Sequence, residues 1–401
     1  MGLTIEQMQF ALLIAAIVSM FARRLKLPYT VGLVFAGLAV ALSPLPLEGE
    51  LLTKNLIYKV FLPPLIFEAA FMMPWRDIRK DLPVTLLLAT VGILISAGII
   101  AAGAFYLLHW PWHVALLFGA LISATDPVSV IATFKSAKVH GRLAMLVEGE
   151  SLMNDGMAVV LFAVVFAAIT GDAVPDAGGI LWSFIQIVGG GVLCGCLVGG
   201  AVLLLLGRTK DHLVEITFTT VAAYGSFLFA EHFHVSGVVA TLVTGLLLGN
   251  IGRSVALSVR GRTSVLAFWE YIGFAVNSLI FLFIGLPLAT QNFAAIWWPL
   301  TVMIILILIS RAVAVYGCCA VFNGAPKLKV SLAHQHILVW GGLRGALSLA
   351  LVLGLPTDIP MRGLIEGIAF GVVAFSIVVQ GLTMTPLLKR LGVLEKPQVT
   401  Q

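Results

Sequence analysis

Apolar runs long enough to cross a lipid bilayer recur along almost the whole chain, and this feature constrains the fold most. A membrane-spanning α-helix needs roughly 20 predominantly apolar residues. Runs of this kind are centred near residues 14, 35, 62, 96, 122, 157, 193, 221, 242, 277, 307, 343 and 373. Charged residues make up 11% of the chain, against roughly 25% of ordinary soluble domains. The sequence therefore predicts an all-α polytopic membrane protein with about 13 transmembrane helices.

The basic residues are distributed unevenly between the connections of these helices. If the N-terminus is outside, the expected outer connections hold only Lys54 and Arg362. The inner ones hold basic clusters such as Arg76, Arg79 and Lys80. This asymmetry follows the positive-inside rule, so the net charge of +5 is not taken as a sign of nucleic-acid binding. We expect a multi-pass protein of the inner (cytoplasmic) membrane of the cell, with the N-terminus outside and the C-terminus cytoplasmic.

The sequence gives no reason to expect a cofactor or an enzyme. Its cysteines lie inside apolar runs and lack the paired spacing of metal or redox sites. We expect all of them to be small core residues; they are Cys194, Cys196, Cys318 and Cys319. The partners that we expect are the lipid bilayer and small ions.

Two of the expected helices carry residues that break a helix near its middle. In the fifth, Pro127 frees the carbonyl of Ser123 and disfavours helix at Asp126. In the twelfth, the sequence WGGLRGALSL places three glycines around Arg344. Unwound backbone at membrane depth is tolerated only where it is buried in protein or lines a water-filled cavity. We expect both helices to be interrupted, although a simple kink is an alternative for a lone membrane proline.

The two interrupted helices are seven spans apart, an odd number, so they run through the membrane in opposite directions. Interrupted helices in corresponding positions of two halves indicate a transporter built from inverted repeats, with the substrate site where the helices cross. The sequence therefore predicts two inverted six-helix repeats joined by a linker helix.

Six charged residues are expected within membrane depth. Six charges would cost about 15–20 kcal/mol on insertion scales, which exceeds the typical net stability of roughly 5–15 kcal/mol. Some must therefore neutralise one another, and the others must be hydrated and functional. Glu150 and Arg344 are the pair that we expect, while Arg311 has either another acid or a helix C-terminus as its partner. The six are Glu68, Asp126, Glu150, Asp155, Arg311 and Arg344.

The acids left over suggest an ion site. Ser151 and Asp155 are four residues apart, so they share one face of a helix. With Asp126 and the loose carbonyls of the fifth helix they form an all-oxygen site, the kind that hard cations prefer. A proton also binds a carboxylate, so one site serves two competing ions. For Asp126 the alternative is that it caps a half-helix that begins at Pro127, and the two roles are compatible.

Four motifs together resemble the sodium/proton antiporters of the monovalent cation:proton antiporter-1 family, the bacterial relatives of eukaryotic sodium/proton exchangers. They are LPPLIFEAA, ISATDPVSV, EGESLMNDG and WGGLRGALSLAL, in the family's order, and the resemblance covers essentially the whole chain. It implies a homodimeric secondary transporter that exchanges Na⁺ (or Li⁺) for H⁺ by alternating access.

The resemblance also implies roles for single residues and for parts of the chain. Asp155 and Asp126 would bind the ion with Ser151, the carbonyl of Thr125 and Glu68. Asn154 would be structural, where electrogenic relatives carry a second aspartate, which implies electroneutral exchange. Scaffold and dimerisation helices would occupy 1–80 and 172–290, the ion-transporting core 81–171 and 291–388, and a short cytoplasmic tail 389–401.

Three other functions are alternatives. Potassium/proton exchange is the nearest, because an oxygen site does not reveal the radius of its ion. An intramembrane aspartyl protease would also use two aspartates on facing helices, but neither aspartate has the expected glycine-rich context and the buried arginines would be unexplained. An ion channel would usually build its filter from symmetric rings of residues.

Overall fold

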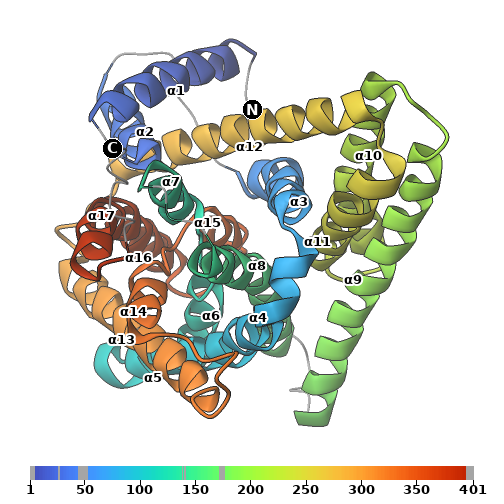
Figure 1. Ribbon diagram of the computed structural model, residues 1–401. Helices are drawn as coiled ribbons and strands as arrows, with labels where there is room; N and C mark the ends of the chain where they lie inside the picture. Colours follow the sequence, from blue (N-terminus) through green and yellow to red (C-terminus); the bar gives the residue numbers. More distant parts are fainter. Residues whose placement is uncertain are drawn as a thin grey trace. The chain divides into compact units, whose positions relative to one another are not determined.

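The computed structural model describes residues 5–25, 28–43, 53–137, 139, 141–170 and 177–393, and the regular structure of these residues is entirely helical (Figure 1). Of the expected cytoplasmic tail, residues 394–401 lie outside the described part. An all-α protein is what the sequence predicted, and that prediction is confirmed.

The helices of the first half are α1 (Ile5–Leu25), α2 (Tyr29–Ala41), η1 (Leu56–Phe61), α3 (Leu62–Met72), α4 (Trp75–Leu87), η2 (Leu88–Gly92), α5 (Ile93–Leu108), α6 (Trp112–Ile122), α7 (Val128–Ala137), α8 (Arg142–Thr170) and α9 (Ala177–Leu206). The second half contains α10 (His212–His232), α11 (Gly237–Leu247), η3 (Leu248–Ala256), α12 (Val259–Leu288), α13 (Trp297–Val321), α14 (Leu332–Trp340), α15 (Ala346–Leu353), α16 (Arg362–Phe375), η4 (Ser376–Gln380) and α17 (Gly381–Arg390). The η elements are short π-helical turns.

The chain is a multi-pass membrane protein. Within the described residues, 9 helical stretches are long and apolar enough to cross a membrane. Each of the predicted apolar runs corresponds to a separate helical stretch, in the same order along the chain, if the two halves of an interrupted helix are counted as one stretch. The elements outside the nine are shorter, so the number of crossings stays a prediction, as do the inverted repeats.

Both predicted interruptions are present. Helix α6 ends at Ile122 and α7 begins at Val128, so residues 123–127 are not helical. Helix α14 ends at Trp340 and α15 begins at Ala346, which leaves residues 341–345 unwound. The breaks therefore lie at the proline and at the glycines that predicted them.

The chain divides into two compact units. The first contains the described residues of 1–52, 81–151 and 278–401, and the second those of 53–80 and 152–277. Helices α4, α8 and α12 each continue from one unit into the other. A packing unit is not the same as a moving part, so the expected division into scaffold and core stays a prediction.

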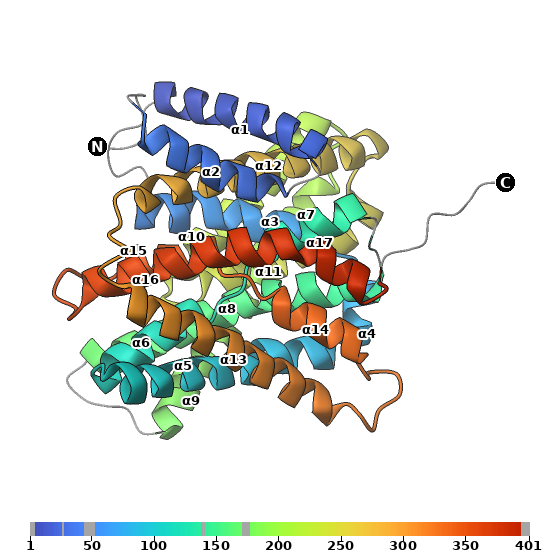
Figure 2. The same cartoon turned by 90° about the vertical axis from the view of Figure 1, so that its left-hand side faces the viewer.

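In the first unit, α5 packs along both α6 and α13 (Figure 1 and Figure 2). A buried apolar cluster joins α4, α7, the start of α8, α13, α14 and α17. Its members include Val84, Phe134, Leu146, Cys318, Ile337 and Met384. Both interrupted helices are thus anchored to this cluster by the halves α7 and α14.

In the second unit, α11 packs against α3, α9 and α10. Phe67, Phe71 and Trp269 form part of its buried cluster. Gly245 of α11 faces the Phe67 backbone of α3, the close approach that small residues permit between membrane helices. The cysteine prediction holds for three of the four, but it is wrong for Cys196, which is exposed on α9.

Candidate functional site

The two helix breaks of the first unit meet. The backbone N–H of Asp126, in the α6–α7 break, donates to the carbonyl of Leu343 in the α14–α15 break at 2.8 Å. The unwound backbone of one break thus provides a hydrogen-bond partner for the unwound backbone of the other. Buried backbone polar groups need such partners where water is absent.

The Asp126 carboxylate caps the N-termini of both half-helices that start here. Its Oδ1 accepts from the backbone N–H of Val128, the first residue of α7, at 2.9 Å. The carboxylate also accepts from the backbone N–H of Ala346, the first residue of α15. Two positive helix ends therefore converge on one negative charge. The capping role left open for Asp126 is confirmed.

Gly345 makes room for this carboxylate. A Cβ at position 345 would overlap the side chain of Asp126. Asp126 of the other break approaches so closely that position 345 must be a glycine. The contact between the two breaks therefore depends on Gly345.

Arg344 caps the opposite kind of helix end. Its Nη1 donates to the carbonyl oxygens of Ser123 at 2.6 Å and Ala124 at 3.0 Å, at the C-terminus of α6. The Ser123 carbonyl is the one that Pro127 was predicted to free. Arg344 is only 1% exposed, so a buried cation stabilises the negative end of the broken helix.

Glu150 forms a hydrogen-bonded ion pair with Arg311, whereas the predicted partner, Arg344, donates to backbone carbonyls and interacts with Glu150 through its charge. Arg311 Nη1 and Nη2 donate to the two carboxylate oxygens of Glu150 at 2.9 and 2.8 Å. Nε and Nη2 also donate to the carbonyl of Leu338, in the last turn of α14, at 3.2 and 3.1 Å. Both partners that were considered for Arg311, an acid and a helix C-terminus, are thus present.

The physical reason for this exchange of partners lies in the backbone. Arg344 is drawn to the carbonyls at the end of α6, and its hydrogen bonds go to them. Arg311 reaches Glu150 by running past Gly342, where a Cβ would meet its guanidinium. The glycine pair in the twelfth helix therefore does more than unwind it: Gly342 admits the arginine that neutralises Glu150.

Ser151 and Thr125, two further predicted ligands, lie together. The hydroxyl of Ser151 on α8 donates to the carbonyl of Thr125 in the α6–α7 break. Both residues are buried. The hydrogen bond uses the single proton of the hydroxyl, which leaves lone pairs on its oxygen. The Ser151 hydroxyl oxygen and the Thr125 carbonyl oxygen therefore lie together at the residue that precedes Asp126.

Asp155 and Asn154 lie about one turn further along α8. Asn154 is 1% exposed, in agreement with a structural role, whereas Asp155 is half-buried. Glu68 belongs to the second unit, where its half-buried carboxyl group packs against Gly273 of α12. That Asp155 and Glu68 complete a site with Asp126 stays a prediction.

Gln380 was not singled out from the sequence. It is buried at the end of the π-helical turn η4, and its Nε2 donates to the carbonyl of Trp340 at 3.0 Å. Trp340 is the last residue of α14, so Gln380 and Arg311 together satisfy the C-terminus of that half-helix. A polar residue in the apolar run FSIVVQGL was the only available signal.

The family model described as "Sodium/hydrogen exchanger, transmembrane" matches residues 10–390. The Na⁺/H⁺ antiporter ApNhaP of Aphanothece halophytica is 40% identical over 377 residues, which cover 94% of this chain and 72% of that protein. The Na⁺/H⁺ antiporter NhaH of Halobacillus aidingensis is 35% identical, with coverage of 96% and 97%.

A similar fold is found among solved structures. The sodium proton antiporter MjNhaP1 of Methanocaldococcus jannaschii, at pH 8, superposes with a TM-score of 0.75 over 97% of this chain and 98% of that one. At 21% identity this likeness bears on the fold alone.

Proposed function

This chain belongs to the family of transmembrane sodium/hydrogen exchangers, and from that premise we propose that it exchanges Na⁺ (or Li⁺) for H⁺ across the membrane. One observation carries the proposal beyond the family. Two interrupted helices cross, and their four free ends are capped by Asp126, Arg344, Arg311 and Gln380. An unwound crossing held by buried charges is the architecture in which transporters bind their substrates.

The proposed cation ligands are oxygen atoms. They are Asp126, Asp155, Ser151, the carbonyl of Thr125 and Glu68. The hydrogen bond from Ser151 to the Thr125 carbonyl supports the part of this set that lies on α8 and in the α6–α7 break. Asp155 is the residue that we propose to carry either the cation or the proton, because Asp126 is already engaged by two helix N-termini.

The remaining parts of the proposal concern the whole transporter. It works by alternating access as a homodimer, with 1–80 and 172–290 as scaffold and 81–171 and 291–388 as moving core. It lies in the inner membrane with its N-terminus outside and the C-terminal tail 389–401 in the cytoplasm. The basic residues at the expected inner ends support this orientation.

The test is transport by purified protein in liposomes. A pH-sensitive dye is quenched by an imposed proton gradient, and Na⁺, Li⁺ and K⁺ are added in turn. We expect dequenching with Na⁺ and Li⁺. Dequenching with K⁺ alone would assign the chain to potassium/proton exchange, and no response to any of the three would contradict antiport.

The matched variant is Asp155→Asn. It removes the titrating carboxylate and keeps the shape of the side chain, so exchange should be lost while the purified protein melts within a few degrees of the wild type. Asp77→Asn, an exposed acid of α4, is the control and should exchange normally. Full exchange by Asp155→Asn would remove the central residue of the proposal.

A further inference from the structure

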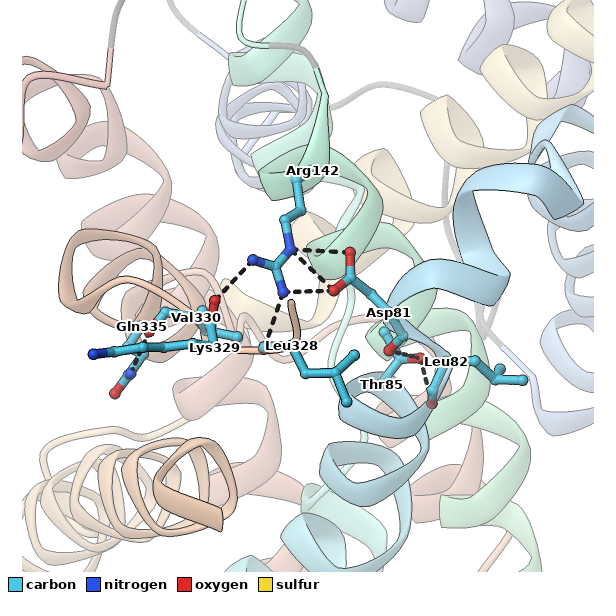
Figure 3. Close-up of polar contacts among 8 residues, drawn as sticks. All are labelled: Asp81, Leu82, Thr85, Arg142, Leu328, Lys329, Val330 and Gln335. Atoms are coloured by element: carbon cyan, nitrogen blue, oxygen red, sulfur yellow. Dashed lines mark hydrogen bonds and ion pairs between the residues drawn. The ribbon is translucent and has the colours of Figure 1, made fainter. Parts of the chain in front are cut away.

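The first residue of α8, Arg142, is the centre of a second polar cluster (Figure 3). Arg142 Nε donates to the two carboxylate oxygens of Asp81 at 2.9 and 3.1 Å, and its Nη2 donates to Oδ1 at 2.6 Å. Asp81 belongs to α4 and only 9% of its side chain is exposed. This side-on, two-pronged geometry is the strong form of an arginine–carboxylate pair.

The same guanidinium holds the connection between α13 and α14. Nη1 donates to the carbonyl of Lys329 at 2.8 Å, and Nη2 to that of Leu328 at 3.0 Å. The next carbonyl, that of Val330, accepts from Nε2 of the buried Gln335 at 2.8 Å. Figure 3 shows these carbonyls on one side of Arg142 and Asp81 on the other.

The connection leads directly into α14. Ser331 caps this helix, since its hydroxyl accepts from the backbone N–H of His334 at 3.3 Å. The residues before the helix are therefore fixed by side chains, and Arg142 of α8 contributes the hydrogen bonds to Leu328 and Lys329.

Helix α8 is also linked to the other end of α14, through Arg311 of α13. Glu150 binds Arg311, which in turn binds the Leu338 carbonyl in the last turn of α14. Arg142 and Glu150 are eight residues apart, about 12 Å along a helix axis. Arg142 holds the connection just before α14, and Glu150 holds its last turn through Arg311, so α8 is linked to both ends of α14.

We infer that Asp81 and Arg142 are positioning residues for ion exchange, a role that rests on the function proposed above. Their hydrogen bonds join α4 and α8 to the connection before α14, and this link is the brace. Through α14 the brace fixes the position of Arg311 and of the α14–α15 break. Ser151 and Glu150 lie on the braced part of α8. Loosening the brace shifts oxygen ligands relative to one another and lowers affinity for the cation, although neither residue touches it.

A neighbouring ion pair offers a matched control. Lys80 binds Asp77 at 2.7 Å within α4, but the two side chains are 64% and 42% exposed, and no contact to another helix is involved in this pair. Exposed pairs of this kind contribute little to stability. Asp77→Asn therefore removes an ion pair from the same helix without touching the brace.

Arg142→Lys is the sharpest variant. Lysine keeps the charge beside Asp81, but a single ammonium does not reproduce the planar fork that joins a carboxylate to two carbonyls. We expect the half-saturating Na⁺ concentration to rise about tenfold, with the maximal rate within a factor of about two. Asp81→Asn should behave likewise, and Asp77→Asn should match the wild type.

A charge swap separates the ion pair from the attachment of the connection. Asp81→Arg with Arg142→Asp restores opposite charges, but an aspartate at position 142 has no N–H to give to the carbonyls of Leu328 and Lys329. We expect no recovery of the half-saturating concentration. Recovery to the wild-type value would show that the ion pair alone suffices and would overturn the positioning of α14 through Arg142.

Hydrogen exchange followed by mass spectrometry gives a readout that does not depend on transport. In Arg142→Lys, amides of residues 325–340 should exchange faster than in the wild type, while those of α5 should be unchanged. Unaltered exchange there together with an unaltered half-saturating concentration would overturn the inference while leaving the proposed function intact. A wild type that exchanges no cation would instead remove the function itself.

Discussion

Arg311 and Glu150 form a buried two-pronged ion pair, with both guanidinium ends within 2.9 Å of a carboxylate oxygen. The side chains are 7% and 2% exposed. Arg311 binds both Glu150 and the C-terminus of α14, whereas Arg344 caps the C-terminus of α6. This difference in partners decides which substitutions should compensate for one another.

Removing one partner of the Arg311–Glu150 pair should destabilise the protein by about 3–5 kcal/mol, the usual cost of leaving a buried charge unpaired. Glu150→Gln and Arg311→Met should each lower the melting temperature in detergent, and the double variant should recover part of the loss. Recovery should be incomplete, because Arg311→Met also abandons the Leu338 carbonyl.

The control for this cycle is Arg344→Met combined with Glu150→Gln. It should compensate less than the Arg311 combination, since Arg344 donates its hydrogen bonds to carbonyls of α6 rather than to Glu150. Compensation in this combination, and none with Arg311→Met, would return Glu150 to the partner first expected from the sequence.

Arg344→Met should itself destabilise the crossing. It leaves the carbonyls of Ser123 and Ala124 without their donor, and hydrogen bonds to a charged group are worth about 1.5–3 kcal/mol. Thermal melting in detergent measures the change. Arg362→Met removes a partly exposed arginine paired with Glu366 of the same helix and should melt close to the wild type; equal losses in both variants would contradict a special role for Arg344.

Gly345→Ala should disable transport through sterics alone. The added methyl group overlaps the Asp126 carboxylate, so the two breaks must separate, at a cost of about 1–3 kcal/mol for overpacking. Exchange in liposomes should fall sharply. Gly98→Ala, at a position with open space around it, should melt and exchange as the wild type does. Normal exchange by Gly345→Ala would mean that the breaks do not need their close approach.

The helix breaks were predictable because their causes are local. Pro127 cannot donate, and the glycines around Arg344 tolerate unwound backbone, so each break could be located to within a few residues. The partners of the buried charges were not predictable in the same way. Arg344 was expected near the crossing as the partner of Glu150, and Arg311 was expected at another acid or a helix C-terminus. Which arginine binds Glu150 depends on where the carbonyls at the ends of α6 and α14 point in three dimensions.

Gln380 and the brace at Arg142 show the same limit. Gln380 lies in a helix whose rotation is set by packing, so its sequence neighbours do not reveal that it faces Trp340. From the sequence, Arg142 was predicted to be one of many basic residues at an inner helix end, and it is the first residue of α8. Its contacts with Asp81 and with the connection before α14 join segments more than 60 residues apart in each case, and no periodicity encodes such a meeting.

Asp126→Asn should separate capping from ion binding. The amide oxygen of asparagine still caps a helix, so the variant should fold and melt near the wild type, while the negative charge is lost. If Asp126 also ligates the cation, the half-saturating Na⁺ concentration should rise strongly or exchange should vanish. Wild-type kinetics in this variant would leave Asp126 as a cap only. Asp126→Ala, which loses both functions, should also melt lower.

The last prediction concerns the number of charges moved in each cycle. Asn154 stands beside Asp155, and an amide offers no titrating carboxylate. Glu150 is held by Arg311, and Asp126 accepts from two helix N-termini. With Asp155 as the only carboxylate that changes its proton, one Na⁺ replaces one H⁺ and exchange should be electroneutral.

A potassium diffusion potential set by an ionophore tests this in liposomes that hold fixed pH and Na⁺ gradients. For each net charge moved, 100 mV is worth about 2.3 kcal/mol, so an electrogenic cycle would shift its zero-flux Na⁺ gradient by well over tenfold. We expect no shift. Asn154→Asp adds a carboxylate where electrogenic relatives carry one, and it provides the matched comparison. A shift of that size in the wild type would require a second carboxylate to release its proton, and Asp126 and Glu68, the other carboxylates of the proposed site, would be the candidates.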